Sequence, residues 1–122
     1  MNPSVLSAPR AASLRAVARL MVDHQVHCVV ITDDPSDAAA LWGIVSDLDL
    51  VAAGSVRGLD EQQAGPSAMT PAVTIAPGET LERAASLMTR YGVSHLVVVD
   101  PVTRRPAGVL STLDLAVALA TR

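Results

Sequence analysis

The sequence contains no lysine, no phenylalanine and only one cysteine, and each shortage narrows what the protein can do. All nine basic residues are arginines scattered along the chain, against 12 acidic residues, so the basic surface typical of nucleic-acid-binding proteins is missing. The single cysteine, Cys28, cannot form an internal disulfide, which fits the reducing cytoplasm. No apolar stretch reaches the roughly 18 residues of a membrane span. We therefore expect a cytoplasmic protein with neither nucleic acid nor membrane as a partner.

What the sequence does contain is aliphatic. Half of its 122 residues are hydrophobic and 17% are charged, which is enough apolar surface to fold rather than remain disordered. The length suits one compact assembly without a separate catalytic domain. The N-terminus shows no secretory-signal pattern, and a repeat that begins at Met1 favours a complete chain.

The chain is one unit written twice, at a spacing that falls from 68 to 65 residues along the sequence. The matches keep the same order of proline, apolar pair, aspartate, glycine, serine and aspartate. The matched pairs are Met1–Val5 with Met69–Val73, Ala8 and Pro9 with Ala76 and Pro77, Leu20 and Met21 with Leu87 and Met88, Asp33 with Asp100, Gly43–Ser46 with Gly108–Ser111, and Leu48–Leu50 with Leu113–Leu115. We place the first unit at residues 1–53, a linker at 54–67 and the second unit at 68–122.

Each unit is predicted to fold as β-α-β-β-α, which makes the chain an α+β protein. Apolar residues at helical spacing predict the first helix of each copy, and in the first copy they include Met21 and Val22. Runs rich in β-branched residues, 29–31 and 96–99, predict strands buried on both faces. Residues 34–41 and 101–106 are expected to be loops, 43–45 and 108–110 strands, and 47–53 and 112–120 helices. About sixty residues cannot bury a sheet well alone, so we expect the two units to pack through their sheets.

These features together resemble the CBS domain: M-N-P or M-T-P at the start, an apolar strand that ends in aspartate, and G-h-h-S-x-x-D-h near the end. Two copies in tandem resemble a CBS pair, or Bateman module. The resemblance covers nearly the whole chain. It implies two sheets that face each other about a pseudo-twofold axis, and two clefts that bind AMP, ADP, ATP or S-adenosylmethionine. It further implies a regulatory rather than enzymatic role, a homodimer formed through the helices, and an effector protein as partner.

The same resemblance implies which residues bind the ligand. The acidic residue of each S-x-x-D motif would hold the ribose hydroxyls, the backbone of the first strand would contact adenine, and residues before the buried strand would lie near phosphate. By position these are Ser46, Asp49, Ser111 and Asp114 for ribose, 6–8 with Thr74, Ile75 and Ala76 for adenine, and His27, Ser94 and His95 for phosphate. The absence of lysine favours a ligand with few phosphates.

The residues themselves leave alternatives open. Ser followed three residues later by Asp is also close to a helix capping box, so both motifs fit a scaffold that binds other proteins and no small ligand. His95 is equally compatible with a hydrogen bond at the strand entrance. Trp42 can stack on a base or cover the sheet edge, and the second copy has Ala107 there. Cys28 is expected to be a buried thiol, and the three histidines lack metal-site spacing. No required cofactor or catalytic residue is predicted.

Overall fold

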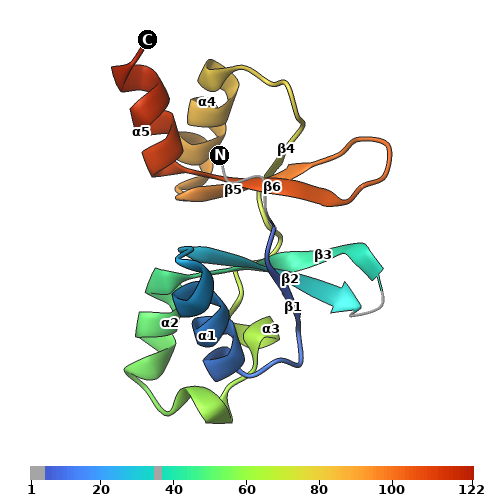
Figure 1. Ribbon diagram of the computed structural model, residues 1–122, viewed down its shortest axis with the longest axis vertical. Helices are drawn as coiled ribbons and strands as arrows, with labels where there is room; N and C mark the ends of the chain where they lie inside the picture. Colours follow the sequence, from blue (N-terminus) through green and yellow to red (C-terminus); the bar gives the residue numbers. More distant parts are fainter. Residues whose placement is uncertain (1–4, 35–36) are drawn as a thin grey trace. The chain divides into compact units, whose positions relative to one another are not determined.

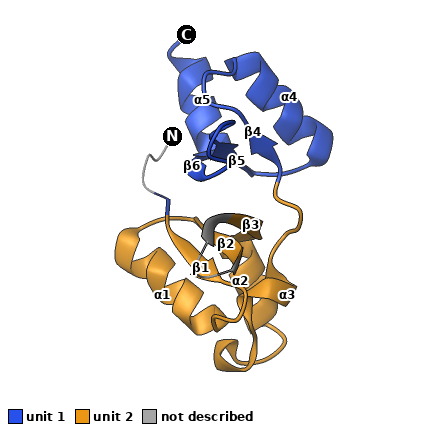
Figure 2. Cartoon of the chain, turned by 90° about the vertical axis from the view of Figure 1, so that its right-hand side faces the viewer, with its two compact units in different colours: residues 1–5, 73–122 blue, residues 6–72 orange. Residues whose placement is uncertain are grey.

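The chain divides into two compact units that repeat one order of elements, as a computed structural model of residues 5–34 and 37–122 shows (Figure 1). The first unit comprises Leu6–Ala72, and the second comprises Val73–Arg122 with Val5 (Figure 2). The first unit contains β1 (Ser7–Pro9), α1 (Leu14–His24), β2 (Cys28–Asp34), β3 (Asp37–Ser46), α2 (Asp47–Gly54), the 3-10 helix η1 (Leu59–Glu61) and α3 (Ala64–Ser67). The second contains β4 (Thr74–Ile75), α4 (Leu81–Tyr91), β5 (His95–Val99), β6 (Pro106–Ser111) and α5 (Thr112–Ala120). The predicted duplicated β-α-β-β-α order is confirmed.

Each unit has its own three-stranded sheet, ordered β1-β2-β3 and β4-β5-β6. The central strand runs parallel to the first strand and antiparallel to the third. In each unit the two long helices lie on one face of the sheet (Figure 1). The central strands supply the most buried residues, including Val29, Ile31, Leu96 and Val97 at 0% exposure, as their β-branched runs predict.

The first helix of each unit is bounded as its sequence suggests. The side chains of Ser13 and Thr80 accept hydrogen bonds from the third backbone N–H of α1 and α4. Gly92 ends α4 in the left-handed conformation, and Gln25 adopts the same conformation after α1, with φ of 53°. Val22, one of the apolar residues that predict this helix, is 71% exposed and lies outside the buried stripe of α1, which contains Leu14, Val17 and Met21.

The second hairpin strand is longer than predicted. The sequence predicts a loop at residues 34–41, but β2 extends to Asp34 and β3 begins at Asp37. Thr32 pairs with Leu41, and Asp34 pairs with Asp37, across irregularities in the ladder. The pairing is made by backbone groups, so it leaves no alternation of polar and apolar residues in the sequence.

The end of the predicted linker folds onto the first unit. The N–H of Ala64 donates to the carbonyl of Ala12 at 2.8 Å, which fixes α3 beside the end of β1. Met69 and Ile44 exchange two backbone hydrogen bonds of 2.8 and 3.2 Å, so the chain forms a bridge along the outer edge of β3. Gly43 permits this approach, since a Cβ there would overlap the Met69 carbonyl.

Candidate ligand-binding site

Each unit presents a Ser-x-x-Asp motif at the point where its third strand turns into its second long helix, which is α2 in the first unit and α5 in the second. Ser46 and Ser111 are the N-cap residues of α2 and α5, and both motifs form complete capping boxes. The N–H of Asp49 donates to Ser46 Oγ at 3.2 Å, and the N–H of Ser46 donates to Asp49 Oδ2 at 2.8 Å. The equivalent distances for Asp114 and Ser111 are 3.1 and 2.8 Å. The capping geometry that the residues suggested is therefore present in both copies.

At Asp49 the capping bonds leave acceptor capacity on the carboxylate. Both bonds at Asp49 use Oδ2 and the backbone, and Oδ1 has no hydrogen bond to any residue in the described part of the chain. Asp49 and Asp114 are half-buried, which leaves them accessible to a ligand. At Asp114 partial burial raises the pKa, but hydrogen bonds from Ser111 lower it, and the net pKa lies below the usual value. Asp114 is thus ionised at neutral pH.

The residues at the start of the central strands lie next to these motifs. The N–H of Asp47 donates to the carbonyl of His27 at 3.0 Å, and the N–H of Thr112 donates to the carbonyl of Ser94 at 2.9 Å. In the β5–β6 ladder His95 stands opposite Ser111. The structure therefore brings His27 to the first Ser-x-x-Asp motif, and brings Ser94 and His95 to the second.

The two histidines differ in their surroundings. The His27 side chain is 74% exposed, and its Nδ1 lies 2.9 Å from Asp47 Oδ2. The His95 side chain is buried, and its Nδ1 lies 3.0 Å from the Ser94 hydroxyl. His95 thus has a side-chain hydrogen-bond partner at the strand entrance, and its place near a phosphate stays a prediction.

The predicted adenine-binding residues lie on the far side of the central strand from the Ser-x-x-Asp motif. Thr74 pairs with Val97 and Ile75 with Val98, whereas β6 and Ser111 flank the opposite edge of β5. Two strand spacings, roughly 10 Å, separate the two edges. The Ile75 side chain is buried in the core, so only its backbone can face a ligand, while Thr74 and Ala76 are exposed.

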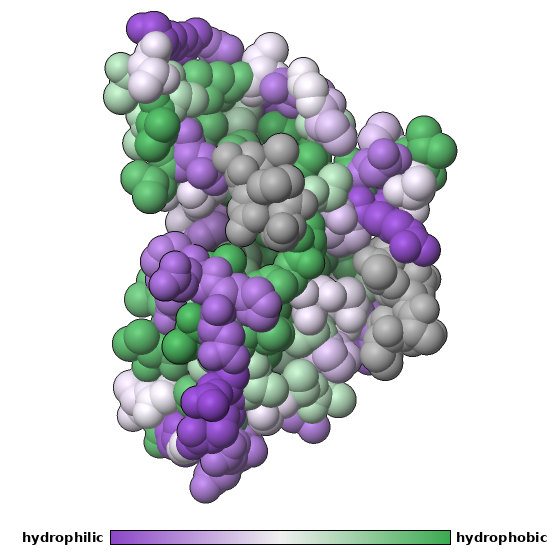
Figure 3. All heavy atoms as spheres, in the orientation of Figure 1, coloured by the Kyte–Doolittle hydropathy of each residue, from purple (hydrophilic) through white to green (hydrophobic). Residues whose placement is uncertain are grey.

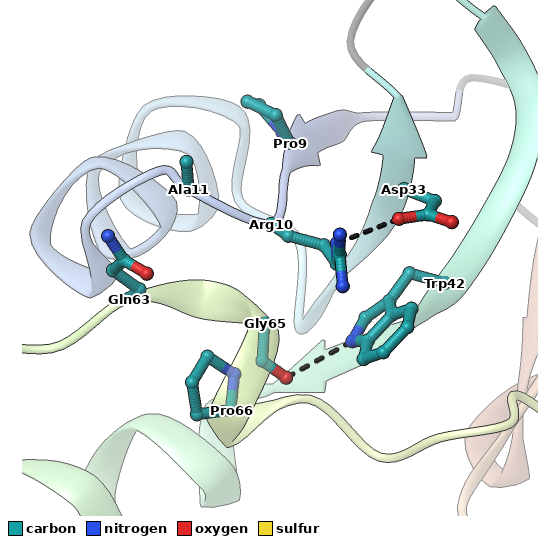
Figure 4. A pocket seen from close by; sticks show the side chains of 8 residues that line it. All are labelled: Pro9, Arg10, Ala11, Asp33, Trp42, Gln63, Gly65 and Pro66. Atoms are coloured by element: carbon teal, nitrogen blue, oxygen red, sulfur yellow. Dashed lines mark hydrogen bonds and ion pairs between the residues drawn. The ribbon is translucent and has the colours of Figure 1, made fainter.

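Trp42, whose role the sequence left open, belongs to a separate cavity of the first unit (Figure 4). Its indole N–H donates to the carbonyl of Gly65 at 3.1 Å, and the guanidinium of Arg10 stacks over its ring at 4.3 Å from the centroid. Sequence reasoning did not select Arg10. The signal available was the difference between copies, because Gly78 and Ala107 occupy the positions of Arg10 and Trp42 in the second copy.

The described residues do not meet the requirements of a reactive cysteine, a metal site or a membrane span. The Cys28 thiol is buried, as predicted, and burial together with the charges of Asp49 and Asp47 raises its pKa to about 12. Within residues 5–34 and 37–122, no three His, Cys, Asp or Glu side chains cluster as a metal ion requires. Nor does this part of the chain contain a helix both long and apolar enough to cross a bilayer.

The comparison with known families decides the assignment, because the CBS domain profile matches residues 1–55 and again 67–121. The chain belongs to the CBS domain family. Among solved CBS structures, a putative signal-transduction protein from Burkholderia ambifaria has a TM-score of 0.84 at 17% identity, covering 98% of this chain and 85% of that one. A CBS domain protein from Pyrobaculum aerophilum, solved with AMP, has a TM-score of 0.82 at 27% identity, covering 100% of this chain and 95% of that one.

One curated relative is an enzyme. The chain is 34% identical over 94 residues to homoserine O-acetyltransferase from Methanocorpusculum labreanum. The match covers 77% of this CBS pair but only 18% of the acetyltransferase.

Proposed function

We propose that this CBS pair is a regulatory module that binds an adenine nucleotide, preferentially AMP, and signals its presence to a partner protein. The observation that carries the proposal is the duplicated Ser-x-x-Asp capping box, in which the half-buried Asp49 retains an acceptor oxygen. The similarity to the AMP-bound Pyrobaculum protein, at 27% identity, supports the adenine nucleotide.

The ribose would bind at the start of α2 in the first unit or of α5 in the second. A carboxylate can accept hydrogen bonds from both vicinal hydroxyls of a ribose, and hydrogen bonds to a charged group contribute about 1.5–3 kcal/mol. Asp49 in the first unit and Asp114 in the second have this role, with Ser46 and Ser111 beside them. The capping bonds hold the carboxylates in place before the ligand arrives, which reduces the entropy lost on binding.

The adenine would lie across the central strand toward the first strand of the unit. In the second unit the backbone of Thr74–Ala76 supplies the hydrogen-bonding groups for the base edge, and in the first unit residues 6–8 correspond. The exposed side chains of Thr74 and Ala76 border this edge, and the buried Ile75 supports it from below.

The number of phosphates decides which adenine nucleotide the site prefers. The groups that can meet it are Ser94 and His95 in the second unit and His27 in the first, and the sequence contains no lysine. His27 is already paired with Asp47. So little positive charge favours a monophosphate over ADP or ATP, and it also leaves S-adenosylmethionine as the competing adenosyl ligand.

Titration calorimetry with AMP, ADP, ATP and S-adenosylmethionine tests the proposal. We expect AMP to bind most tightly, and Asp49→Asn or Asp114→Asn to weaken the site it belongs to by at least tenfold. Asp60→Asn is the matched control, because Asp60 is an exposed carboxylate of η1 that pairs with Arg15. Binding that both site variants leave unchanged would overturn the ribose assignment. If none of the four ligands binds at millimolar concentration, the module is instead a ligand-free interaction scaffold.

We further propose that the functional form is a homodimer. Helices α2 and α5 expose large apolar side chains: Leu48 and Val51 on α2 are 74% and 69% exposed, and Leu113 and Val117 on α5 are 68% and 55% exposed. Apolar surface is visible on the helical side of each unit (Figure 3). Burial of these apolar side chains against a second copy of the chain would stabilise the homodimer. Light scattering should give a dimer mass, and Leu48→Arg with Leu113→Arg should give a monomer; a monomeric wild type contradicts this proposal alone.

A further inference from the structure

A cavity in the first unit lies apart from both Ser-x-x-Asp motifs, at the opposite end of the β2–β3 hairpin. It measures about 540 Å³, within the range of small-molecule sites. The residues around it come from the end of β1, the hairpin and α3 (Figure 4). Its walls are apolar at Pro9, Ala11, Trp42 and Pro66.

The charged groups of the cavity form one ion pair, and Gln63 adds an uncharged polar side chain. Arg10 Nε lies 2.8 Å from Asp33 Oδ1, and the guanidinium stacks over Trp42. Trp42 is itself held by its hydrogen bond to Gly65. Arg10 uses Nε for the ion pair. Its two terminal nitrogens hold no hydrogen bond to another residue within 5–34 and 37–122. Asp33 Oδ2 is likewise uncommitted within these residues, and both side chains are about half exposed, at 46% and 51%.

We propose that this cavity binds a free α-amino acid with an apolar side chain. The terminal nitrogens of a guanidinium bind a carboxylate in bidentate fashion, so Arg10 would take the α-carboxylate. Asp33 Oδ2 would accept from the α-ammonium group. The apolar side chain of the ligand would lie against Trp42 and Pro66, where its burial adds affinity.

Charge selects a zwitterion over a simple anion or cation. Asp33 places a carboxylate beside the guanidinium, so a ligand with negative charge alone is disfavoured. A ligand with positive charge alone meets the guanidinium of Arg10. A zwitterion has no net charge and presents both signs to the Arg10–Asp33 pair.

The second copy of the repeat lacks the arginine, the tryptophan and the linker wall of this site, and keeps only the proline Pro77 and the carboxylate Asp100. Gly78 and Ala107 replace Arg10 and Trp42, and the Gln63–Pro66 wall belongs to a linker that occurs once in the chain. Asp100, the counterpart of Asp33, instead accepts hydrogen bonds of 2.8 and 2.9 Å from two N–H groups of its own turn. The cavity is therefore a single site per chain, independent of the duplicated nucleotide sites.

Trp42 makes the proposal directly testable, because it is the only tryptophan in the chain and its emission reports on this cavity. L-leucine and L-phenylalanine should change the emission with saturation at millimolar concentration or below. On the wild-type protein, 4-methylpentanoate, which lacks the ammonium, and 3-methylbutylamine, which lacks the carboxylate, should each bind at least tenfold more weakly than leucine.

Two variants locate the charges. Arg10→Met and Asp33→Asn should each weaken leucine binding by tenfold or more while retaining the wild-type circular dichroism spectrum. Arg15→Met is the matched control, since Arg15 forms a similar exposed ion pair in the same unit away from the cavity. The proposal is wrong if no amino acid changes the emission, if either analogue binds as well as leucine, or if Arg15→Met has the same effect as Arg10→Met. AMP binding is unaffected by any of these outcomes.

Discussion

Asp49 and Ser46 are joined by two hydrogen bonds that run in opposite directions, and Asp114 and Ser111 repeat this relationship 65 residues later. The same side chains thus begin a helix and form the candidate ribose site. A loss of function at these positions must therefore be separated from a loss of stability, which the first prediction addresses.

Ser46→Ala and Ser111→Ala should each lower the free energy of unfolding by about 1 kcal/mol, since each removes the side-chain acceptor of an N-cap. Urea denaturation measures the change. Ser55→Ala is the control: Ser55 follows the end of α2, and its hydroxyl donates to the carbonyl of Ala52 on the exposed surface. We expect that change to stay within about 0.5 kcal/mol of wild type. Equal losses in all three variants would contradict a capping contribution.

Gln25→Gly should stabilise the protein by about 1 kcal/mol, because Gln25 occupies a left-handed conformation that costs a residue with a Cβ about that much. The second copy already has Gly92 at this position, with φ of 63° and no neighbouring atom within 4 Å of the place that a Cβ would occupy. Gly92→Ala should therefore lower the midpoint of thermal unfolding while Gln25→Gly raises it. The same sign for both changes would refute the explanation.

Gly43→Ala should lower the free energy of unfolding by about 2 kcal/mol or more, because its Cβ would collide with the backbone of Met69 and lie 2.7 Å from Thr70 Cγ2. Backbone cannot move away as a flexible side chain can. Gly58→Ala is the control, as nothing lies within 4 Å of its added carbon and its φ is −61°. Urea denaturation of both variants should show a large loss for the first and none for the second.

Cys28 should resist alkylation in the native protein. With a pKa of about 12, its thiolate fraction at pH 8 is on the order of one in ten thousand, and the thiol is buried as well. Mass spectrometry after iodoacetamide treatment should find Cys28 unmodified until urea unfolds the chain. Rapid alkylation of Cys28 in the native protein would contradict this prediction, because it would show that the thiol becomes accessible without unfolding.

The same shift gives a pH dependence. The thiol has a pKa near 9.0 when unfolded and about 12 when folded, so unfolding releases a proton between these values. The stability associated with the neutral thiol is therefore complete below pH 9 and is lost as the pH rises toward 12. Cys28→Ala should flatten this part of a plot of unfolding free energy against pH.

Much of the fold could be predicted because the sequence contains two copies of the same β-α-β-β-α pattern. The buried strands and the capped helices follow from β-branched runs and from residues such as Ser13 and Gly92, whose local preferences agree with the tertiary structure. Val22 is exposed although it fits the apolar spacing of α1, because periodicity gives the direction of a helical face but not its width. The strand from Asp37 escapes prediction because backbone pairing alone extends it.

The Ser-x-x-Asp motifs could be found from the sequence, whereas the cavity around Arg10 could not. Ser46 and Asp49 are accessible to sequence reasoning, since their motif is local and duplicated. The cavity around Arg10 is not, because Asp33, Trp42 and Gly65 reach it from segments far apart in the chain. Only the contrast between copies, arginine against glycine and tryptophan against alanine, marks these positions in the sequence.

The bridge between Met69 and Ile44 has a consequence for association in solution. A β-strand at the side of a sheet offers unpaired N–H and C=O groups that can recruit a strand of another molecule, and such recruitment leads to fibrils. Met69 occupies those groups at Ile44, near the C-terminal end of β3, where the neighbouring residues Gly43 and Val45 are apolar. A fragment that ends before Met69 would expose this edge. The first residues of the second copy therefore protect the sheet of the first unit against aggregation.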